Sequence, residues 1–240
     1  MNASLAAVLV SAAISLKVPL EDAAKQFTAT SPGDAISFSL GSSGQLAAQI
    51  TQGAPVDLFI SASPAEIERL LVARRIEVPT LTVIAGNRLV VVVPRGTAPA
   101  ADLAALAAPR FSRVAIGNPK TVPAGRYARE ALTSSGILDA IESRIVFGEN
   151  VRQVVDLVAR GEADAGIVYA TDVPIGGTAI TKAFEIPETM HAPIVYEGAV
   201  IAGSTSATRA REFLKFLTSA AGRDVVVKHG FLPPRSTATK

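Results

Sequence analysis

Residues that can donate hydrogen bonds follow several apolar runs in this sequence, where each run gives way to a helical pattern or a turn. Ser15 and Ser43 follow the first two runs, and Tyr169 lies at the end of a later one. Ala124 and Val151 stand at the starts of two helical patterns, where only their backbone N–H groups can donate. If the runs are strands of an open α/β sheet, these positions line the crevice at the carboxyl ends of the strands. Helix N-termini there present unpaired N–H groups and the positive end of the helix dipole, so the pattern predicts an anion site.

Three of these residues also have an ordinary structural interpretation. Ser15 and Ser43 fit the role of N-caps, which stabilise a helix by about 1 kcal/mol without any ligand. Tyr169 fits the role of a core aromatic residue whose hydroxyl has found a partner. Taken one at a time, the structural roles are favoured. The joint pattern after several strands favours a binding site, although it does not identify the anion.

Seven apolar runs have the length and composition of strands, and most are unbroken, which is typical of strands buried on both faces. They cover Leu5 to Ile14, Ala35 to Leu40, Val56 to Ser61, Arg88 to Pro94, Arg113 to Asn118, Arg144 to Glu149 and Ala163 to Ala170. The segments between them space their apolar residues as helices do. These helical segments are Leu20 to Thr30, Gln45 to Gln52, Ala65 to Arg75, Ala124 to Ser134 and Val151 to Arg160, with an amphipathic helix ATRAREFLKFLTSAAG and a last helix following. The alternation predicts an α/β protein with parallel sheets.

Two long strand-like segments bracket the middle of the chain. TVIAGNRLVVVV runs from Thr82 to Val93, and IVYEGAVIAG runs from Ile194 to Gly203. Two crossings of this kind are what a discontinuous lobe and an inserted lobe need, so the pattern fits a two-lobed, hinged protein. A single doubly wound sheet with longer end strands fits the same pattern, and both interpretations stay open at this point.

Composition narrows the classes of partner and site. The 240 residues are 49% hydrophobic, enough for a sizeable core, and the formal net charge is only +2, so we expect no nucleic-acid partner. No run approaches the roughly 18 to 20 apolar residues of a membrane-spanning helix. The absence of Cys excludes disulfides and thiolate metal sites. No positive charge precedes the N-terminal apolar run, so we interpret it as the first strand and expect any export signal to be missing from this chain.

The sequence lacks the nucleotide-binding and nucleophile motifs that an α/β enzyme would carry after its strands. Neither a phosphate-binding loop ending in Gly-Lys-Ser/Thr nor Gly-x-Gly-x-x-Gly follows the first strand. The segment GSSGQ does not form a Gly-x-Ser-x-Gly nucleophile elbow, because residue 45 is Gln. The two histidines, His191 and His229, neighbour no candidate nucleophile in the sequence. We therefore expect a binding protein and not an enzyme.

Four motif blocks resemble the molybdate-binding protein family of bacterial ABC importers, along nearly the whole chain. The blocks are AISLKVPLEDAAKQF, SSGQLAAQITQGAPVDLFISA, GNPKTVPAGRYAREAL and GENVRQVVDLVARGEADAGIVYATD. The Val-Pro-Ala-Gly-x-Tyr-Ala core of the third block is highly characteristic of that family. The resemblance departs from the family mainly at Ile14, where a small residue is usual, and this change removes no donor.

The resemblance implies an oxyanion ligand, molybdate or tungstate, and no separate cofactor. By resemblance, Ser15 and Ser43 supply hydroxyl and backbone N–H groups, Ala124 and Val151 supply backbone N–H groups, and Tyr169 supplies its phenol. The metal is thus expected to bind as an oxyanion and not as a bare cation. Ser42 is expected to cap or shape the turn before the helix.

The resemblance also implies an architecture and a cellular role. The fold class is α/β, with two doubly wound α/β lobes joined by a hinge, as in type II periplasmic binding proteins. Lobe 1 comprises residues 1–84 plus 198–240, lobe 2 comprises residues 85–197, and the ligand cleft is expected between them. The expected protein is a monomeric, extracytoplasmic solute-binding protein that delivers its ligand to the membrane permease of an ABC transporter.

Other tetrahedral oxyanions remain as alternatives. Part of the phosphate population keeps a proton near neutral pH, so a phosphate site gains from a carboxylate acceptor, whereas a fully ionised dianion needs donors only. The five candidate positions offer no carboxylate. Sulfate is the stronger competitor, because it is also a tetrahedral dianion and only the size of the cavity separates it from molybdate.

Overall fold

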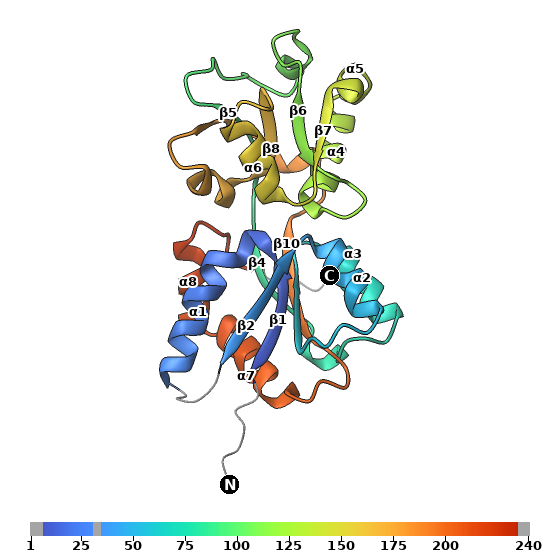
Figure 1. The fold of residues 1–240 in the computed structure, drawn as a ribbon, viewed down its shortest axis with the longest axis vertical. Helices are drawn as coiled ribbons and strands as arrows, with labels where there is room; N and C mark the ends of the chain where they lie inside the picture. The colour runs from blue at the N-terminus through green and yellow to red at the C-terminus, as the bar shows by residue number, and fades with distance from the viewer. Residues whose placement is uncertain (1–6, 31–34, 235–240) are drawn as a thin grey trace. The chain divides into compact units, whose positions relative to one another are not determined.

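Two separate five-stranded sheets organise the chain, each in its own unit (Figure 1). The computed structural model describes residues 7–30 and 35–234. Unit 1 combines the residues up to Gly86 with those from Val195 onward, and unit 2 is the inserted segment Asn87–Ile194. The first strand was predicted to begin at Leu5, which lies outside the described residues.

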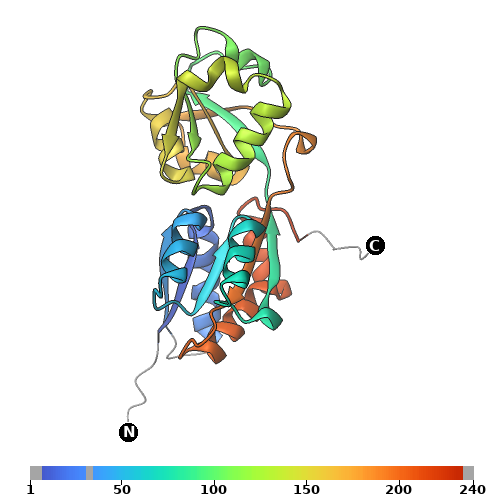
Figure 2. The same cartoon turned by 90° about the vertical axis from the view of Figure 1, so that its right-hand side faces the viewer.

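The sheet of unit 1 has the strand order β2-β1-β3-β10-β4. Its strands are β1 (Val8–Ala13), β2 (Ile36–Gly41), β3 (Leu58–Ser61), β4 (Thr82–Gly86) and β10 (Val195–Val200). The first three are parallel, whereas β10 runs antiparallel to both β3 and β4. Figure 2 shows β4 and β10 side by side, and these are the strands next to the two points where the chain passes between units.

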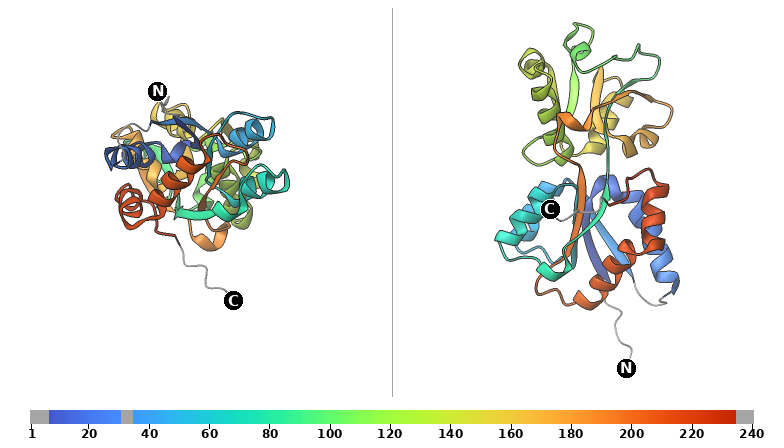
Figure 3. Two further views of the ribbon diagram at one scale, coloured as in Figure 1. Left: turned by 90° about the horizontal axis from the view of Figure 1, so that it is seen from below. Right: turned by 180° about the vertical axis from the view of Figure 1, so that it is seen from behind.

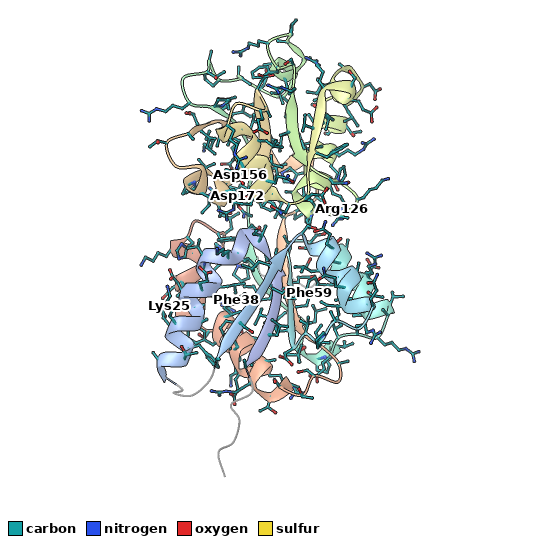
Figure 4. The ribbon with its side chains drawn as sticks, in the orientation of Figure 1. Lys25, Phe38, Phe59, Arg126, Asp156 and Asp172 are labelled. Carbon is teal, nitrogen blue, oxygen red and sulfur yellow. The ribbon has the colours of Figure 1, made fainter. Side chains whose placement is uncertain are left out.

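Helices cover both faces of this sheet, with α1, α7 and α8 on one face and α2 and α3 on the other (Figure 1). Their bounds are α1 (Lys17–Thr30), α2 (Ser43–Thr51), α3 (Pro64–Val72), α7 (Ala207–Thr218) and α8 (Ala220–Lys228). Phe27 of α1 meets Phe213 of α7 edge to face at 5.3 Å between ring centroids. On the other face, Phe59 (labelled in Figure 4) is fully buried in a cluster with Leu46 and Leu70. The two apolar layers therefore fix the sheet from which the first candidate donors project.

The sheet of unit 2 has the strand order β7-β6-β8-β5-β9. Its elements are β5 (Leu89–Pro94), β6 (Val114–Gly117), α4 (Pro123–Ser134), α5 (Leu138–Ile141), β7 (Ile145–Gly148), α6 (Val151–Ala159), β8 (Ala165–Tyr169) and β9 (Ile180–Glu185). Strands β6, β7 and β8 are parallel, and β5 is antiparallel to β8 and β9. The right-hand view of Figure 3 shows α4 and α6 on opposite sides of these strands, as right-handed crossovers require.

The predicted two-lobed α/β fold is confirmed, and the single-sheet alternative is wrong. The prediction of parallel sheets needs correction, because both sheets are mixed: the strands beside the crossings run antiparallel to the parallel ones. The predicted crossing Thr82 to Val93 is not one strand, since Asn87 and Arg88 separate β4 from β5. The predicted 16-residue amphipathic helix ends at Thr218, where the Ser219 side chain caps α8 instead. Strand β9 was not predicted, because its segment ITKAFE has a polar, part-exposed pattern.

Candidate anion-binding site

In unit 1, Ser15 and Ser43 lie at the same edge of the sheet. They follow the neighbouring parallel strands β1 and β2, whose last residues, Ala13 and Gly41, are in register. Ser15 is the middle residue of a short 3-10 helix, Ile14–Leu16, and Ser43 is the first residue of α2. Both are buried, with exposed fractions of 6% and 1%. The two hydroxyls are thus held at the carboxyl end of the sheet, as the sequence predicts.

Neither serine is an N-cap, so the structural alternative is wrong for both. The N-cap of the 3-10 helix is Ala13, and the Ser15 hydroxyl lies instead 3.0 Å from the Tyr196 phenol oxygen. The Ser43 hydroxyl oxygen accepts a hydrogen bond of 3.1 Å from the backbone N–H of Ala62, just beyond β3. These contacts tie both hydroxyls to the sheet and not to their own helices.

Helix α2 begins two residues earlier than predicted, at Ser43 and not Gln45. Its N-cap position is occupied by Ser42, whose side chain makes no capping hydrogen bond. The Ser42 hydroxyl oxygen is buried and has no hydrogen-bond partner among the described residues. The Ser42 side chain therefore does not occupy the N–H groups at the start of α2, a kind of position at which helices bind anions.

In unit 2, the start of α4 leaves the Ala124 backbone N–H without an acceptor among the residues that the structure describes. The N-cap residue is Val122, which carries no side-chain acceptor, and the first helical residue is Pro123, which has no N–H. Ala124 is fully buried. A buried N–H that remains unpaired costs about 1 to 3 kcal/mol, so this helix start favours an acceptor supplied by a ligand.

Two glycines allow α4 to begin against the end of β6. A Cβ on Gly125 would lie 1.9 Å from the backbone oxygen of Gly117, and a Cβ on Gly117 would lie 2.4 Å from the Val122 side chain. Close backbone approach of this kind permits only glycine. The Pro-Ala-Gly sequence thus places the Ala124 N–H directly at the carboxyl end of β6.

The other two candidates of unit 2 lie where the strands on either side of β6 end. Val151 is the first residue of α6, after β7, and the Asn150 side chain caps this helix by accepting from the Gln153 N–H at 3.1 Å. This cap does not reach the Val151 N–H, which remains directed out of the helix start. Tyr169 is the last residue of β8 and is 2% exposed. Since β6 pairs with both β7 and β8, the three residues lie at the same edge of one sheet.

Asp172, which the sequence analysis did not single out, is the fully buried acid of this edge. It belongs to the 3-10 helix Ala170–Gly176, which packs on α6, and it lies in unit 2 as labelled in Figure 4. Its carboxylate accepts a hydrogen bond of 3.2 Å from the Tyr169 N–H. Burial raises the pKa of Asp172 to about 7, against the opposing effects of Arg152 and of that hydrogen bond. Asp172 therefore fixes the backbone of a candidate donor. The only sequence signal was an acid three residues after Tyr169.

Cation-binding and membrane-spanning features were also sought in the part of the chain that the structure describes. Within residues 7–30 and 35–234, no group of three or more His, Cys, Asp or Glu side chains is placed to hold a metal ion. Over the same ranges, no helix has the length and apolar character needed to cross a membrane. The donors described above are hydroxyl and N–H groups, which suit an anion.

Comparison with known proteins agrees with this chemistry. A family model described as bacterial extracellular solute-binding protein matches residues 8–232. The chain belongs to this family. The solute-binding protein is 37% identical to the molybdate-binding protein ModA of Haemophilus influenzae, over 95% of this chain and 91% of that protein. It is 35% identical to the putative ABC transporter substrate-binding lipoprotein YvgL of Bacillus subtilis, over 92% and 85% of the two chains.

A solved structure of a molybdate-binding protein also matches this solute-binding protein. The periplasmic molybdate-binding protein of Azotobacter vinelandii matches it with a TM-score of 0.85 and 27% identity, covering 95% of this chain and 100% of that one. The resemblance to molybdate-binding proteins is thus confirmed. The roles of the five candidate donors stay predictions.

Proposed function

We propose that this solute-binding protein captures molybdate, and also tungstate, outside the cytoplasm and delivers it to the permease of an ABC transporter. The proposal is supported by its relatives, which carry the names molybdate-binding protein and ABC transporter substrate-binding lipoprotein. It is supported equally by the chemistry of the two sheet edges, which offer donors to an anion.

The observation that carries the proposal is the start of α4. Ala124 is fully buried, and its N–H follows a valine N-cap and a proline, so the helix supplies a donor for which the described residues provide no acceptor. A tetrahedral dianion accepts hydrogen bonds at every oxygen and carries no proton to place. Buried, uncapped helix starts are stabilised by such a ligand through both hydrogen bonding and the helix dipole.

We further propose that both units contribute donors to one anion. Ser15 and Ser43 belong to unit 1, whereas Ala124, Val151 and Tyr169 belong to unit 2. An anion that is bound by all five residues therefore needs both units. Binding is then expected to bring the units together by a hinge motion at the two crossings, near Gly86 and Val195.

In this proposal the protein acts as a monomer, catalyses no reaction, requires no cofactor and does not bind nucleic acid. The net charge of +2 is too small for sequence-independent attraction to a polyanion. Sulfate remains the second candidate ligand, because it presents the same charge and geometry in a smaller anion.

A panel of oxyanions tests the proposed ligand by its effect on thermal unfolding. A ligand that binds only the folded state stabilises it by about 4 kcal/mol at a thousandfold excess over its Kd, so molybdate and tungstate should raise the melting temperature clearly. Phosphate should not raise it, and sulfate should require a much higher concentration. A shift with phosphate or sulfate at concentrations where molybdate has no effect would overturn the assignment.

A further inference from the structure

The Ser15 hydroxyl has a buried partner on a strand far away in the sequence. Its oxygen lies 3.0 Å from the phenol oxygen of Tyr196, the second residue of β10, which is 181 residues further along the chain. Tyr196 is fully buried, and its ring packs edge to face on Phe231 at 5.3 Å between centroids. The ring is therefore fixed by packing, and in the contact with Ser15 either oxygen can be the donor.

The number of hydrogens available decides which of Ser15 and Tyr196 donates to the other once an anion is bound. A serine hydroxyl has one hydrogen and two acceptor lone pairs. If Ser15 donates its hydrogen to the anion, it has none left for Tyr196, so the phenol must donate to the Ser15 oxygen. The reverse arrangement would point a lone pair of Ser15 at a negative charge, which is repulsive.

Ser43, the second candidate serine of unit 1, also accepts a hydrogen bond, and there the direction of the bond is fixed. The Ser43 oxygen accepts from the Ala62 backbone N–H at 3.1 Å, and a backbone N–H can only donate. The Ser43 hydrogen is therefore available to donate outward. Hydrogen bonds in such chains also polarise one another, which strengthens the outward donor.

We propose that Tyr196 is a positioning residue for the oxyanion site: its phenol donates to Ser15 and so commits the Ser15 hydroxyl to act as a donor toward a fully ionised anion. This inference rests on the proposed function. With Ser15 and Ser43 both held as donors, a protonated anion such as hydrogenarsenate or hydrogenphosphate finds no serine oxygen oriented to accept its proton. Tyr196 thereby contributes to selectivity without touching the ligand.

Tyr196→Phe removes the phenol hydroxyl and leaves the ring that packs on Phe231. Titration calorimetry should show molybdate binding roughly tenfold weaker, because the Ser15 hydroxyl loses its preferred direction. Ser15→Ala should weaken binding by about tenfold to a hundredfold. In the double variant, Tyr196→Phe should add no more than about a twofold loss to that of Ser15→Ala, since Tyr196 acts through Ser15.

Selectivity provides a measurement that a purely structural role of Tyr196 would not change. Selenate and arsenate are similar in size, but arsenate carries a proton near neutral pH. The wild-type protein should bind selenate more tightly than arsenate. Tyr196→Phe should reduce the ratio of the two affinities, because the Ser15 oxygen can then accept a hydrogen bond from the protonated arsenate. Ser37→Ala, which removes a hydroxyl bonded to the Val8 carbonyl at the other end of β1 and β2, serves as the control and should leave both affinity and preference unchanged.

Two outcomes would overturn the inference while leaving molybdate binding intact. One is a loss of molybdate affinity from Tyr196→Phe that is as large in the Ser15→Ala background as in the wild-type protein. The other is a wild-type protein that binds molybdate but prefers arsenate to selenate, a measurement that does not depend on the folding of any variant. Failure of the wild-type protein to bind molybdate would instead count against the proposed function.

Discussion

Gly125→Ala should displace the start of α4 and weaken oxyanion binding. The new Cβ would lie 1.9 Å from the Gly117 backbone oxygen, whereas ordinary contacts begin at 3.4 Å, so helix and strand must separate by roughly 1.5 Å. Hydrogen bonds tolerate only about 0.5 Å of variation in distance, so the Ala124 N–H would no longer reach the anion. A lost hydrogen bond to a charged ligand is worth about 1.5 to 3 kcal/mol, which predicts roughly tenfold to hundredfold weaker molybdate binding.

The matched control is Gly222→Ala, where the added Cβ would lie 2.1 Å from the Phe216 backbone oxygen between α7 and α8. Both variants should lose about 1 to 3 kcal/mol of stability through overpacking, but Gly222→Ala should keep wild-type affinity. Titration calorimetry well below both melting temperatures separates the two effects. Wild-type affinity in Gly125→Ala, or an equal loss in Gly222→Ala, would refute the reasoning about the Ala124 N–H.

Three further predictions follow from the two sheet edges. Ser43→Ala should weaken molybdate binding by about tenfold to a hundredfold and Tyr169→Phe by a similar or smaller factor; unchanged titrations for both would place the site elsewhere. Small-angle scattering should show a smaller radius of gyration with molybdate, and an unchanged radius alongside tight binding would contradict closure. Burial raises the pKa of Asp172 from 3.8 to about 7, so the folded state holds a proton that the unfolded state releases. Denaturant titrations should therefore show the free energy of unfolding falling as pH rises between these two pKa values, by at most about 1.4 kcal/mol per pH unit. Asp172→Asn should make the free energy of unfolding less dependent on pH over the same range.

The sequence predicts the parallel parts of both sheets well because their strands are continuous apolar runs buried on both faces. The runs ending near Ala13, Gly117 and Tyr169 are of this kind, and the candidate donors follow directly from where they end. Helix starts are similarly readable when proline is present, as at Pro123. The positions of the donors therefore depend on local signals that a single sequence contains.

Contacts between distant segments could not be predicted in this way. Nothing near Ser15 indicates that Tyr196 is its partner, since the contact depends on β10 running antiparallel beside β3. The antiparallel direction of β10 follows from the path of the chain between units and leaves no periodic signal. The Ser43 contact with Ala62 likewise depends on β3 lying next to β1, so a serine at a helix start was open to interpretation as an N-cap.

A crystal structure of the protein with tungstate, located by its anomalous scattering, tests the central claim most directly. The account predicts one strong peak with oxyanion oxygens within about 2.7 to 3.2 Å of the Ser15 and Ser43 hydroxyls, the Ala124 and Val151 N–H groups and the Tyr169 phenol. A tungstate bound away from these residues, or held by only one of the two sets of donors, would contradict it.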